Sequence, residues 1–139
     1  MWIQKEITLE PRSQGIYLID QEVLSKVPDI RLIKAGIMTV FCKHTSCGIT
    51  LNESWDPSVR TDFQNALNKL APESGEYLHD DEGSDDMPSH IKCSLVGCTV
   101  MVPITNGKPN LGTWQGLYFC EFRRYMHQRT LVITIHGEK

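Results

Sequence analysis

The chain has 139 residues, of which 40% are hydrophobic and 22% are charged, and its formal net charge is -3. This length fits one domain spanning residues 1–139. The sequence has no run of Lys or Arg and a pI of about 5.9, whereas nucleic-acid-binding domains usually carry a basic face, so we expect no nucleic-acid partner. The longest mostly apolar stretch, residues 95–102, is far shorter than the ~20 residues that cross a bilayer, so we expect no membrane partner.

The beginning of the chain predicts two strands and a short helix. Alternating apolar residues over 3–9 indicate a half-buried strand, and residues 15–18 form a second one. The Asp20 carboxylate can accept orphan backbone N–H groups, so we expect it to cap a helix that continues to about Val27.

A longer apolar run and an amphipathic helix follow. Residues 33–42 are apolar at both parities, which predicts a strand covered on both faces. The sheet continues at residues 49–51, after a polar interruption at 43–48. Asp56, followed by a proline, is a strong helix start, and an apolar stripe of helical spacing runs from there to Leu70.

A polar loop rich in acidic residues, 73–86, precedes a second and shorter helix. Met87, Ile91 and Leu95 are expected on the buried side of this helix. Gly97 is its expected C-terminal stop, because helices often end at a glycine.

The last part of the chain predicts a hairpin and two further strands. Residues 98–104 alternate, and Asn106-Gly107 favours a type I′ turn with a return strand over 111–123. A final strand covers 129–136. The sum is seven to nine strands and two to three helices that do not alternate strictly, which argues against a doubly wound fold. We predict an α+β fold, a mainly antiparallel sheet or flattened barrel with the helices packed on one side.

Five cysteines are present, an odd number without a Cys-x-x-Cys pair. Secreted disulfide frameworks use an even count, and structural zinc sites show close cysteine pairs. We therefore expect reduced, mostly buried thiols and a cytoplasmic protein. The N-terminus carries charges at once and lacks the apolar segment of a signal peptide.

The polar segment 43–48 is a candidate site because it is wedged between two apolar strands. Its imidazole (His44), two hydroxyls (Thr45 and Ser46) and free backbone N–H groups together suit phosphate or metal binding. The alternative is a turn whose hydroxyls satisfy its own backbone.

The acidic loop is the second candidate. Five carboxylates within seven residues repel one another unless solvent or a cation screens them. Glu82, Asp85 and Asp86 are therefore candidates for holding Mg²⁺, a hard cation that prefers carboxylate oxygens. The alternative is a solvated loop whose acids favour the positive N-terminal end of the next helix.

The start of that helix is the third candidate. His90 should border the apolar stripe and point back toward the acidic loop, and Lys92 adds a positive charge near a helix N-terminus, where anions bind. The alternative for His90 is a histidine at the edge of the core, bonded to a carbonyl. No histidine pair has helical ligand spacing, so a zinc site of His44, His79 and His90 depends on the fold.

The segment 112–123 is the fourth candidate. Its glycines suggest a bulge or a close approach to a ligand, and Trp114 shares a face with three other large residues. Glu121 and Arg123 lie on one face of the strand, where they form either a structural ion pair or a pair of ligand-binding groups.

The residues and their spacing resemble the YjbQ family, also called the secondary thiamine-phosphate synthase family, over essentially the whole chain. The runs that carry the resemblance are His44-Thr45-Ser46-x-Gly48, Asn52-Glu53, Asp56-Pro57-x-Val59, Tyr77-x-His79, Glu82-Gly83-x-Asp85-Asp86-Met87-Pro88-x-His90-Ile91-Lys92 and Gly112-Thr113-Trp114-Gln115-Gly116.

The resemblance implies a homotrimer and a polar pocket that contains His44, His79 and His90, sometimes with a metal. It also implies a thiamine-phosphate synthase activity, which joins a pyrimidine diphosphate to a thiazole phosphate and releases pyrophosphate. Two rival hypotheses are a histidine-site metal-dependent hydrolase and a non-catalytic binder of a small phosphorylated metabolite. The expected cofactor is a divalent metal, Mg or Zn.

Residues and resemblance together give three sets of candidate site residues. The candidates for proton transfer are His44, His79, His90 and Asp86. The candidates for substrate or phosphate binding are Thr45, Ser46, Lys92, Thr113, Trp114, Gln115, Glu121 and Arg123. The candidate metal ligands are His44, His79, His90, Glu82, Asp85 and Asp86.

Overall fold

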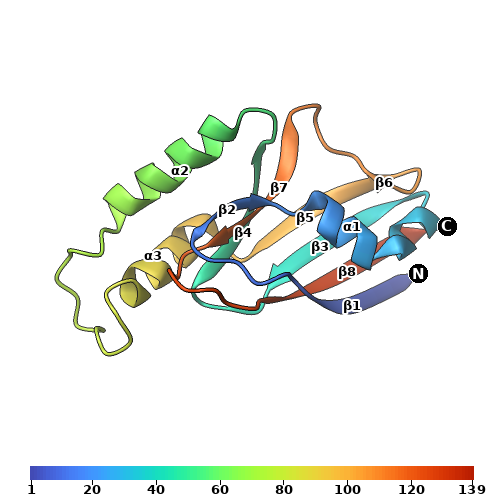
Figure 1. The fold of residues 1–139 in the computed structure, drawn as a ribbon. Helices are drawn as coiled ribbons and strands as arrows, with labels where there is room; N and C mark the ends of the chain where they lie inside the picture. The colour runs from blue at the N-terminus through green and yellow to red at the C-terminus, as the bar shows by residue number, and fades with distance from the viewer.

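Eight β-strands and three α-helices make up this computed structural model, which describes residues 1–139 (Figure 1). The strands are β1 (Trp2–Thr8), β2 (Gly15–Leu18), β3 (Ala35–Cys42), β4 (Cys47–Glu53), β5 (Thr99–Thr105), β6 (Lys108–Pro109), β7 (Gln115–Glu121) and β8 (Thr130–Glu138). The α-helices are α1 (Asp20–Lys26), α2 (Pro57–Leu70) and α3 (Asp86–Val96), and a 3₁₀ helix, η1, covers Pro28–Leu32. The predicted α+β class with a mainly antiparallel sheet is confirmed.

The strands form two antiparallel sheets that curl toward each other as a half-barrel. One sheet has the order β1-β8-β3-β5-β6, and the other has the order β2-β7-β4. Helices α2 and α3 lie beside the smaller sheet, whereas α1 lies at the other end of the molecule, near the two termini (Figure 1). None of the helices has the length and apolarity needed to traverse a bilayer.

The larger core fills the space between the two sheets. Val40 of β3, Ile133 of β8 and Phe119 of β7 are each at most 1% exposed there, and α1 adds Val23. Complete burial of one such side chain stabilises the fold by about 1.5–3 kcal/mol relative to an exposed one. The core therefore joins both sheets and α1 into one unit.

Strand β7 is buried on both faces. Leu117 and Phe119 belong to the core between the sheets, while Tyr118 and Cys120 point the other way and pack in a smaller cluster with Leu67 of α2. Helix α2 begins as predicted, because the Asp56 carboxylate accepts a hydrogen bond of 2.9 Å from the backbone N–H of Ser58.

Strand β3 is covered on one face only, which corrects the prediction for residues 33–42. Met38 and Val40 are buried in the core, but Ile37 and Phe41 on the opposite face are 42% and 43% exposed. The second sheet and α1 pack against the inner face, and no element of this chain packs on the outer one.

The strand that returns from the predicted hairpin is also different. Asn106 and Gly107 have the expected positive φ angles, 50° and 76°. The returning strand is the two-residue β6, whereas β7 crosses to the other sheet. Pro109 lacks an N–H group, which is compatible only with an edge position, so the hairpin stops early.

Helix α3 buries a polar face, which corrects the expected apolar one. Leu95 is 59% exposed, and Met87 and Ile91 are only half-buried. The buried residues of the helix are Asp86, Pro88, Ser89 and Lys92. The apolar spacing did not predict the buried face, because the neighbouring segments present polar partners to it.

At α1, the predicted cap is also corrected. The Asp20 carboxylate accepts hydrogen bonds of 2.9 and 3.1 Å from Leu117 N–H and does not cap the helix.

Candidate functional site

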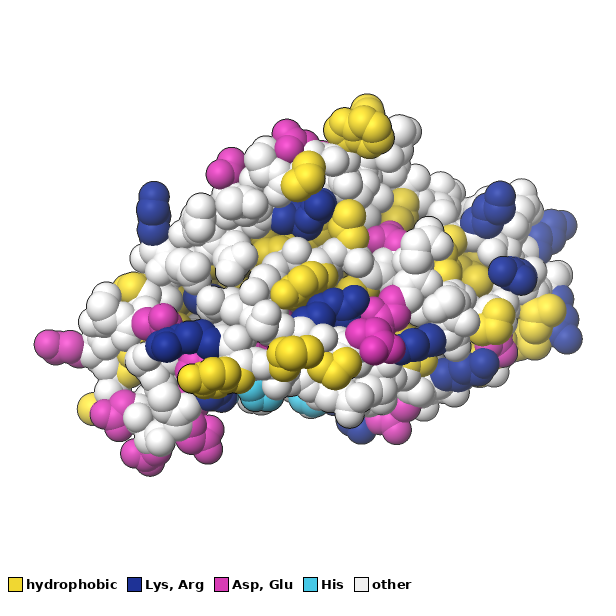
Figure 2. Space-filling model, viewed as in Figure 1, with side chains coloured by type: hydrophobic (Ala, Val, Ile, Leu, Met, Phe, Trp, Pro, Cys, Tyr) yellow, Lys and Arg dark blue, Asp and Glu magenta, His cyan; other side chains and the backbone are white.

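The site lies where the acidic loop between α2 and α3 folds back against the start of α3. Acidic side chains gather over this loop at the lower left of the molecule, and histidine side chains emerge beside them at the lower edge (Figure 2). His79 comes from the loop, Asp86 is the first residue of α3, and His90 follows one helical turn later. The helix therefore fixes the spacing of Asp86 and His90, and the loop brings His79 to them.

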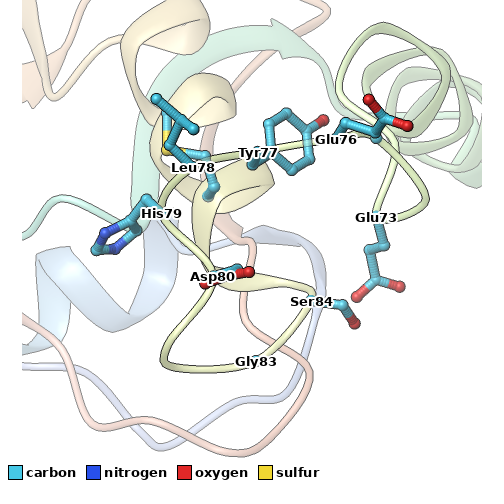
Figure 3. A pocket seen from close by; sticks show the side chains of 10 residues that line it. Glu73, Glu76, Tyr77, Leu78, His79, Asp80, Gly83 and Ser84 are labelled. Atoms are coloured by element: carbon cyan, nitrogen blue, oxygen red, sulfur yellow. The ribbon is translucent and has the colours of Figure 1, made fainter.

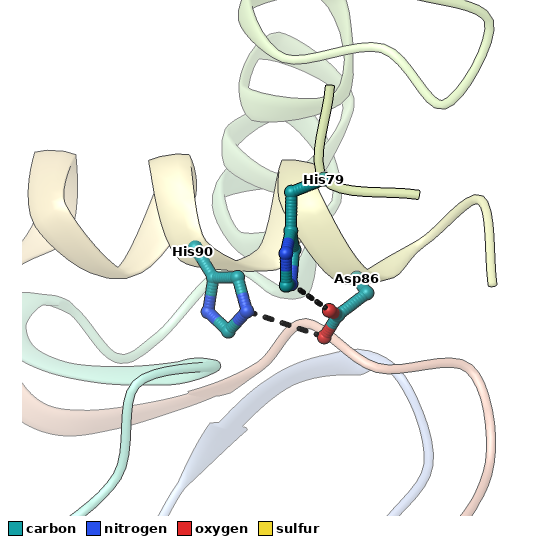
Figure 4. Close-up of side chains that lie close together, drawn as sticks. All are labelled: His79, Asp86 and His90. Carbon is teal, nitrogen blue, oxygen red and sulfur yellow. Dashed lines mark hydrogen bonds and ion pairs between the residues drawn. The ribbon is translucent and has the colours of Figure 1, made fainter. Parts of the chain in front are cut away.

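These three residues form what we call the histidine cluster. His79 Nε2 lies 2.7 Å from Asp86 Oδ2, and His90 Nε2 lies 3.3 Å from Asp86 Oδ1 (Figure 4). Each residue offers one ligand atom, and the three atoms lie within 4.8 Å of one another. Two imidazoles thus meet opposite oxygens of a single carboxylate.

The backbone fixes the tautomer of His90. Its Nδ1 lies 2.7 Å from the carbonyl oxygen of Thr45, which can only accept a hydrogen bond, so Nδ1 carries the proton. In the neutral ring Nε2 then has a lone pair directed at the Asp86 carboxylate, which is also an acceptor. That arrangement is stable only when Nε2 is protonated or when a cation lies between the two groups.

Asp86 is held as a carboxylate although it is only 1% exposed. Burial raises its pKa, but the hydrogen bond with His79 and the positive charges of His90 and Arg123 outweigh burial and lower the pKa below its usual value. Arg123 Nη1 donates to Asp86 Oδ1 at 2.7 Å. The cluster therefore contains a charged acceptor at any pH near neutrality.

Arginines from the β7–β8 loop bind the other acids of the segment. Arg123 Nε donates to Asp85 Oδ2 at 3.0 Å, and the backbone N–H of Arg124 donates to the same oxygen at 2.9 Å. Arg123 also donates to the carbonyl oxygen of Glu82, whose own side chain is exposed. Asp85 and Asp86 are therefore adjacent, but Arg123 already compensates both charges.

His44 lies near the cluster but offers a different ring atom. Its Nε2 accepts a 2.9 Å hydrogen bond from the backbone N–H of Thr130, so the neutral ring carries its proton on Nδ1. Burial lowers the pKa of His44, and the charge of Arg129 lowers it further. In this conformation His44 is a hydrogen-bond donor, and its Nε2 lone pair is not available to a metal.

The three predicted histidines line one shallow groove of about 590 Å³. The residues that line this groove are His44, Thr45, His79, Met87, His90, Cys93, Ser94 and Cys98. The fold thus brings together the histidines from three separate segments.

A second hollow lies on the other side of His79, inside the loop itself. Its volume is about 570 Å³, and Glu73, Glu76 and Tyr77 contribute to its walls (Figure 3). His79 and Met87 line both this loop hollow and the groove. The histidine cluster therefore lies between an acidic hollow and the groove, which adds the polar side chains of His44, Thr45 and Ser94.

A buried ion pair between Arg129 and Glu121 holds the His44 segment through Ser46. Arg129 donates to both oxygens of Glu121 at 2.7 Å and to the hydroxyl of Ser46 at 2.8 Å. Glu121 is 0% exposed and Arg129 is 6% exposed. The side-chain pair of Glu121 and Arg123, one of the two alternatives for these residues, does not form, since Arg123 turns to the acidic loop. Sequence reasoning missed Arg129, although a charged residue at the start of an apolar strand was a signal.

Lys92 is not part of the groove. It is 2% exposed and donates to Asn68 Oδ1 of α2 at 2.5 Å, on the face of α3 that points away from His90. Burial lowers the pKa of its amine. Lys92 therefore joins two helices in this structure.

Three further candidates, Thr113, Trp114 and Gln115, lie at the opposite end of the smaller sheet. Gln115 pairs with Glu53 at the end of β4, whereas Cys47 at its start is next to the His44 segment. At ~3.3 Å per residue, these two ends of β4 are about 20 Å apart. Trp114 packs edge-on against Trp55 there, with ring centroids 6.2 Å apart. The structure of one chain does not bring these residues to the histidine cluster.

Comparison with known proteins gives concordant matches over the whole chain. The sequence model described as "UPF0047 protein YjbQ-like" matches residues 5–138. The UPF0047 protein YjbQ of Escherichia coli O157:H7 is 40% identical over 99% of this chain and 100% of its own length. A UPF0047 protein of Methanocaldococcus jannaschii is 44% identical over 77% of this chain and 75% of its own length.

Solved structures agree with these matches. A YjbQ/UPF0047 protein of unknown function from Clostridium acetobutylicum is 36% identical, with a TM-score of 0.80 over 96% of this chain and 99% of that one. A YjbQ-like protein from Sulfolobus solfataricus has a TM-score of 0.85 over 99% of both chains at 22% identity, and that likeness concerns the fold alone.

Proposed function

This chain belongs to the UPF0047 family of YjbQ-like proteins, and on that premise we propose that it is a metal-dependent enzyme acting on a small phosphorylated metabolite. The histidine cluster would hold the metal, and the substrate would lie in the groove. The observation that carries the proposal is the convergence of His79, Asp86 and His90, whose ligand atoms lie within 4.8 Å of one another.

The donor set fits a transition metal better than magnesium. Two imidazoles and a carboxylate suit zinc, whereas Mg²⁺ prefers oxygen ligands alone. The hydrogen bond from His90 Nδ1 to the Thr45 carbonyl supports this assignment. Metal-binding histidines usually donate their second N–H to such an acceptor, which fixes the ring and directs Nε2 at the ion. His44 is excluded from the ligand set because Thr130 occupies its Nε2.

Zinc held by His79, Asp86 and His90 would supply Lewis-acid polarisation of substrate oxygens and activation of water for hydrolysis. The chain's own groups would then orient the substrate. The Nδ1–H of His44 and the exposed Thr45 border the groove, where they can donate to phosphate oxygens. Arg123 positions Asp86 rather than the substrate, because both Asp85 and Asp86 already accept its hydrogen bonds. This chemistry is that of a hydrolase.

Thiamine-phosphate synthase activity is the second candidate. Two hollows, of about 590 and 570 Å³, meet at His79 and Met87, which offers places for two substrates side by side. This reaction also needs a cation for the pyrophosphate leaving group, and the pairing of Asp85 and Asp86 with Arg123 weakens the support for a Mg²⁺ site there.

The first experiment measures bound metal and activity together. Elemental mass spectrometry should find near-stoichiometric zinc in the wild type and a loss of at least tenfold in His79→Ala and Asp86→Asn. His136→Ala, a histidine on the outer face of the larger sheet, is the matched control and should retain the metal. The zinc-loaded wild type should hydrolyse a phosphomonoester from a small panel, and both cluster variants should lose this activity.

Two outcomes decide between the candidates. A wild-type protein that binds no transition metal after reconstitution and shows no turnover would contradict the hydrolase proposal. Formation of thiamine phosphate from both substrates with Mg²⁺, undiminished in zinc-free protein, would establish the synthase instead.

We also propose that the protein is a cytoplasmic homotrimer. Ile37, Phe41 and Met101 are 42%, 43% and 63% exposed on the outer face of the larger sheet, where a further subunit would cover them. All five cysteines are unpaired, which supports a reducing compartment. Light scattering should give three times the monomer mass of 15.8 kDa.

A further inference from the structure

Two buried thiols lie on either side of the His44 segment. Cys42 is the last residue of β3 and Cys47 is the first of β4, and they are 2% and 0% exposed. Their sulfur atoms are only 3.1 Å apart. The backbone at both positions is fixed, since Cys42 N–H donates to the Cys98 carbonyl at 2.8 Å and Cys47 pairs with Glu121 of β7. The sheets therefore hold the two thiols facing each other.

We propose that Cys42 and Cys47 are a site of reversible oxidation, at which a hydroperoxide converts the two thiols into a disulfide. A disulfide has an S–S length of about 2.05 Å, so the sulfur atoms need to approach by only about 1 Å. Side-chain rotation supplies a movement of that size without a change in the strands. The disulfide would close residues 43–46 into a small ring.

The two thiols have unequal roles in this step. Either sulfur can be the donor in the hydrogen bond between them. We assign the first attack to Cys42, which follows the arrangement with Cys47 as the donor. It attacks one peroxide oxygen, the O–O bond breaks, and the second oxygen leaves as water or an alcohol. Cys47 sulfur then attacks the resulting sulfenic acid, the S–O bond breaks, and water leaves with the second thiol proton.

The groove gives a small oxidant a route toward this pair. Cys93 and Cys98 line the groove beside His44, and Cys93 Sγ lies 3.8 Å from the carbonyl oxygen of His44. The segment that the disulfide would close is thus the wall that separates the groove from Cys42 and Cys47. Hydrogen peroxide is neutral and close to water in size, which makes it the oxidant best suited to reach sulfur atoms that are 2% and 0% exposed.

Closure of the ring would act on the histidine cluster through Thr45. The Thr45 carbonyl accepts the hydrogen bond that sets the orientation of His90. A ring around residues 43–46 restricts that carbonyl and the adjacent His44. This consequence rests on the proposed function, whereas formation of the disulfide does not depend on any metal or substrate.

The sequence offers a sharp test because Lys43 lies between the two cysteines. Trypsin cuts after Lys34, Lys43 and Arg60, so Cys42 and Cys47 fall on separate peptides, 35–43 and 44–60, with no other cysteine in either. The folded protein is treated with hydrogen peroxide, its remaining thiols are blocked, and it is digested without reductant. We expect the two peptides to appear joined, and to separate after treatment with dithiothreitol.

Two alanine variants complete the experiment. Cys47→Ala should lose the joined peptides, and Cys120→Ala, which removes an equally buried cysteine from the other cluster, should keep them. Wild type in which Cys42 and Cys47 remain reduced while Cys93 oxidises would overturn the proposal. A link from either cysteine to the peptide that begins at Cys93 would overturn it as well. Metal content of the oxidised and reduced protein is measured separately, so failure of the metal site leaves the peptide result decisive.

Discussion

His44 and His90 line the same groove, and each uses one ring nitrogen for a hydrogen bond with the backbone. His90 donates from Nδ1 to the Thr45 carbonyl, while His44 accepts at Nε2 from the N–H of Thr130. His90 is the donor in its bond and His44 is the acceptor in its own, so the ring nitrogens that remain free differ between the two residues. His90 keeps Nε2 facing Asp86, where it either carries a proton or binds a cation, and His44 keeps an N–H group at Nδ1. Single backbone hydrogen bonds thus give the two histidines of this groove different chemical roles.

The His44 contact predicts a pH dependence of stability. Because burial lowers its folded-state pKa, the unfolded chain binds the proton more readily, and the stabilisation is present above the unfolded pKa of ~6.5 and declines as pH falls below it. One group contributes a slope of at most about 1.4 kcal/mol per pH unit. His44→Gln keeps an acceptor for Thr130 but cannot titrate. Urea unfolding at pH 7.5 and 5.5 should therefore show that the wild type loses more stability than the variant, and equal losses would contradict the prediction.

The sequence predicted the histidines of the site and Asp86, but not the residues that hold the His44 segment. His44, His79 and His90 were identified because polar residues interrupt apolar or helical patterns there, and such interruptions are visible locally. Asp86, which contacts both His79 and His90, was identified as well. Thr130, which bonds His44, and Arg129, which bonds Ser46 beside it, come from segments more than 80 residues away. No periodicity encodes such contacts, so the near neighbour Arg123 was the only ion-pair partner considered for Glu121, beside the alternative that both residues bind a ligand.

At the scale of single elements, helix α3 shows where periodicity misleads. Its apolar residues have helical spacing, yet Asp86, Ser89 and Lys92 occupy the buried face. That face packs against Arg123 and Asn68, which bind the carboxylate and the amine. Helix α2 follows its pattern in part, because Phe63 and Leu67 pack against the apolar outer face of the smaller sheet, whereas Leu70 is 70% exposed. Sequence therefore predicted both helices, but their buried residues only where the partner was apolar.

The end of α3 depends on a backbone conformation that glycine tolerates. Gly97 has φ 97° and ψ 165°, and its carbonyl accepts a 3.0 Å hydrogen bond from Ile49 of β4. A Cβ added at this position would meet no atom within 4 Å, so Gly97→Ala tests backbone strain without a clash. We expect a loss of about 1–3 kcal/mol in the free energy of unfolding.

Chemical denaturation measures this loss, with Ser94→Ala on the exposed side of the same helix as the control. The control should stay within about 0.5 kcal/mol of wild type. Should Gly97→Ala unfold at the same denaturant concentration as the control, the strain would be absent.

At the scale of the whole molecule, the Arg129–Glu121 pair connects the two sheets. Arg129 directly precedes β8 of the larger sheet, Glu121 ends β7 of the smaller one, and Ser46 between β3 and β4 accepts a third hydrogen bond. The fold class was predictable from the strand and helix patterns. The division into two sheets was not, because the hairpin signal at Asn106-Gly107 does not reveal that β6 stops after two residues.

Breaking this pair should be costly. Arg129→Met leaves the fully buried Glu121 carboxylate without its partner, and we expect a loss of about 3–5 kcal/mol. The double variant Arg129→Met/Glu121→Gln removes the isolated charge and should recover part of that loss. Equilibrium unfolding of the wild type, both single variants and the double variant gives the coupling energy. Additive losses would mean that the two residues stabilise the fold independently.

The position of β8 has a consequence for how the protein is made. β8 pairs with both β1 and β3, although it is the last strand of the fold and β1 is the first. A ribosome adds about 5–20 residues per second, so the roughly 90 residues between Cys42 and Thr130 take several seconds to translate. During that interval the nascent chain carries two strands whose facing edges are open, and open edges invite pairing with other chains. Completion of the larger sheet therefore waits until β8 has been synthesised.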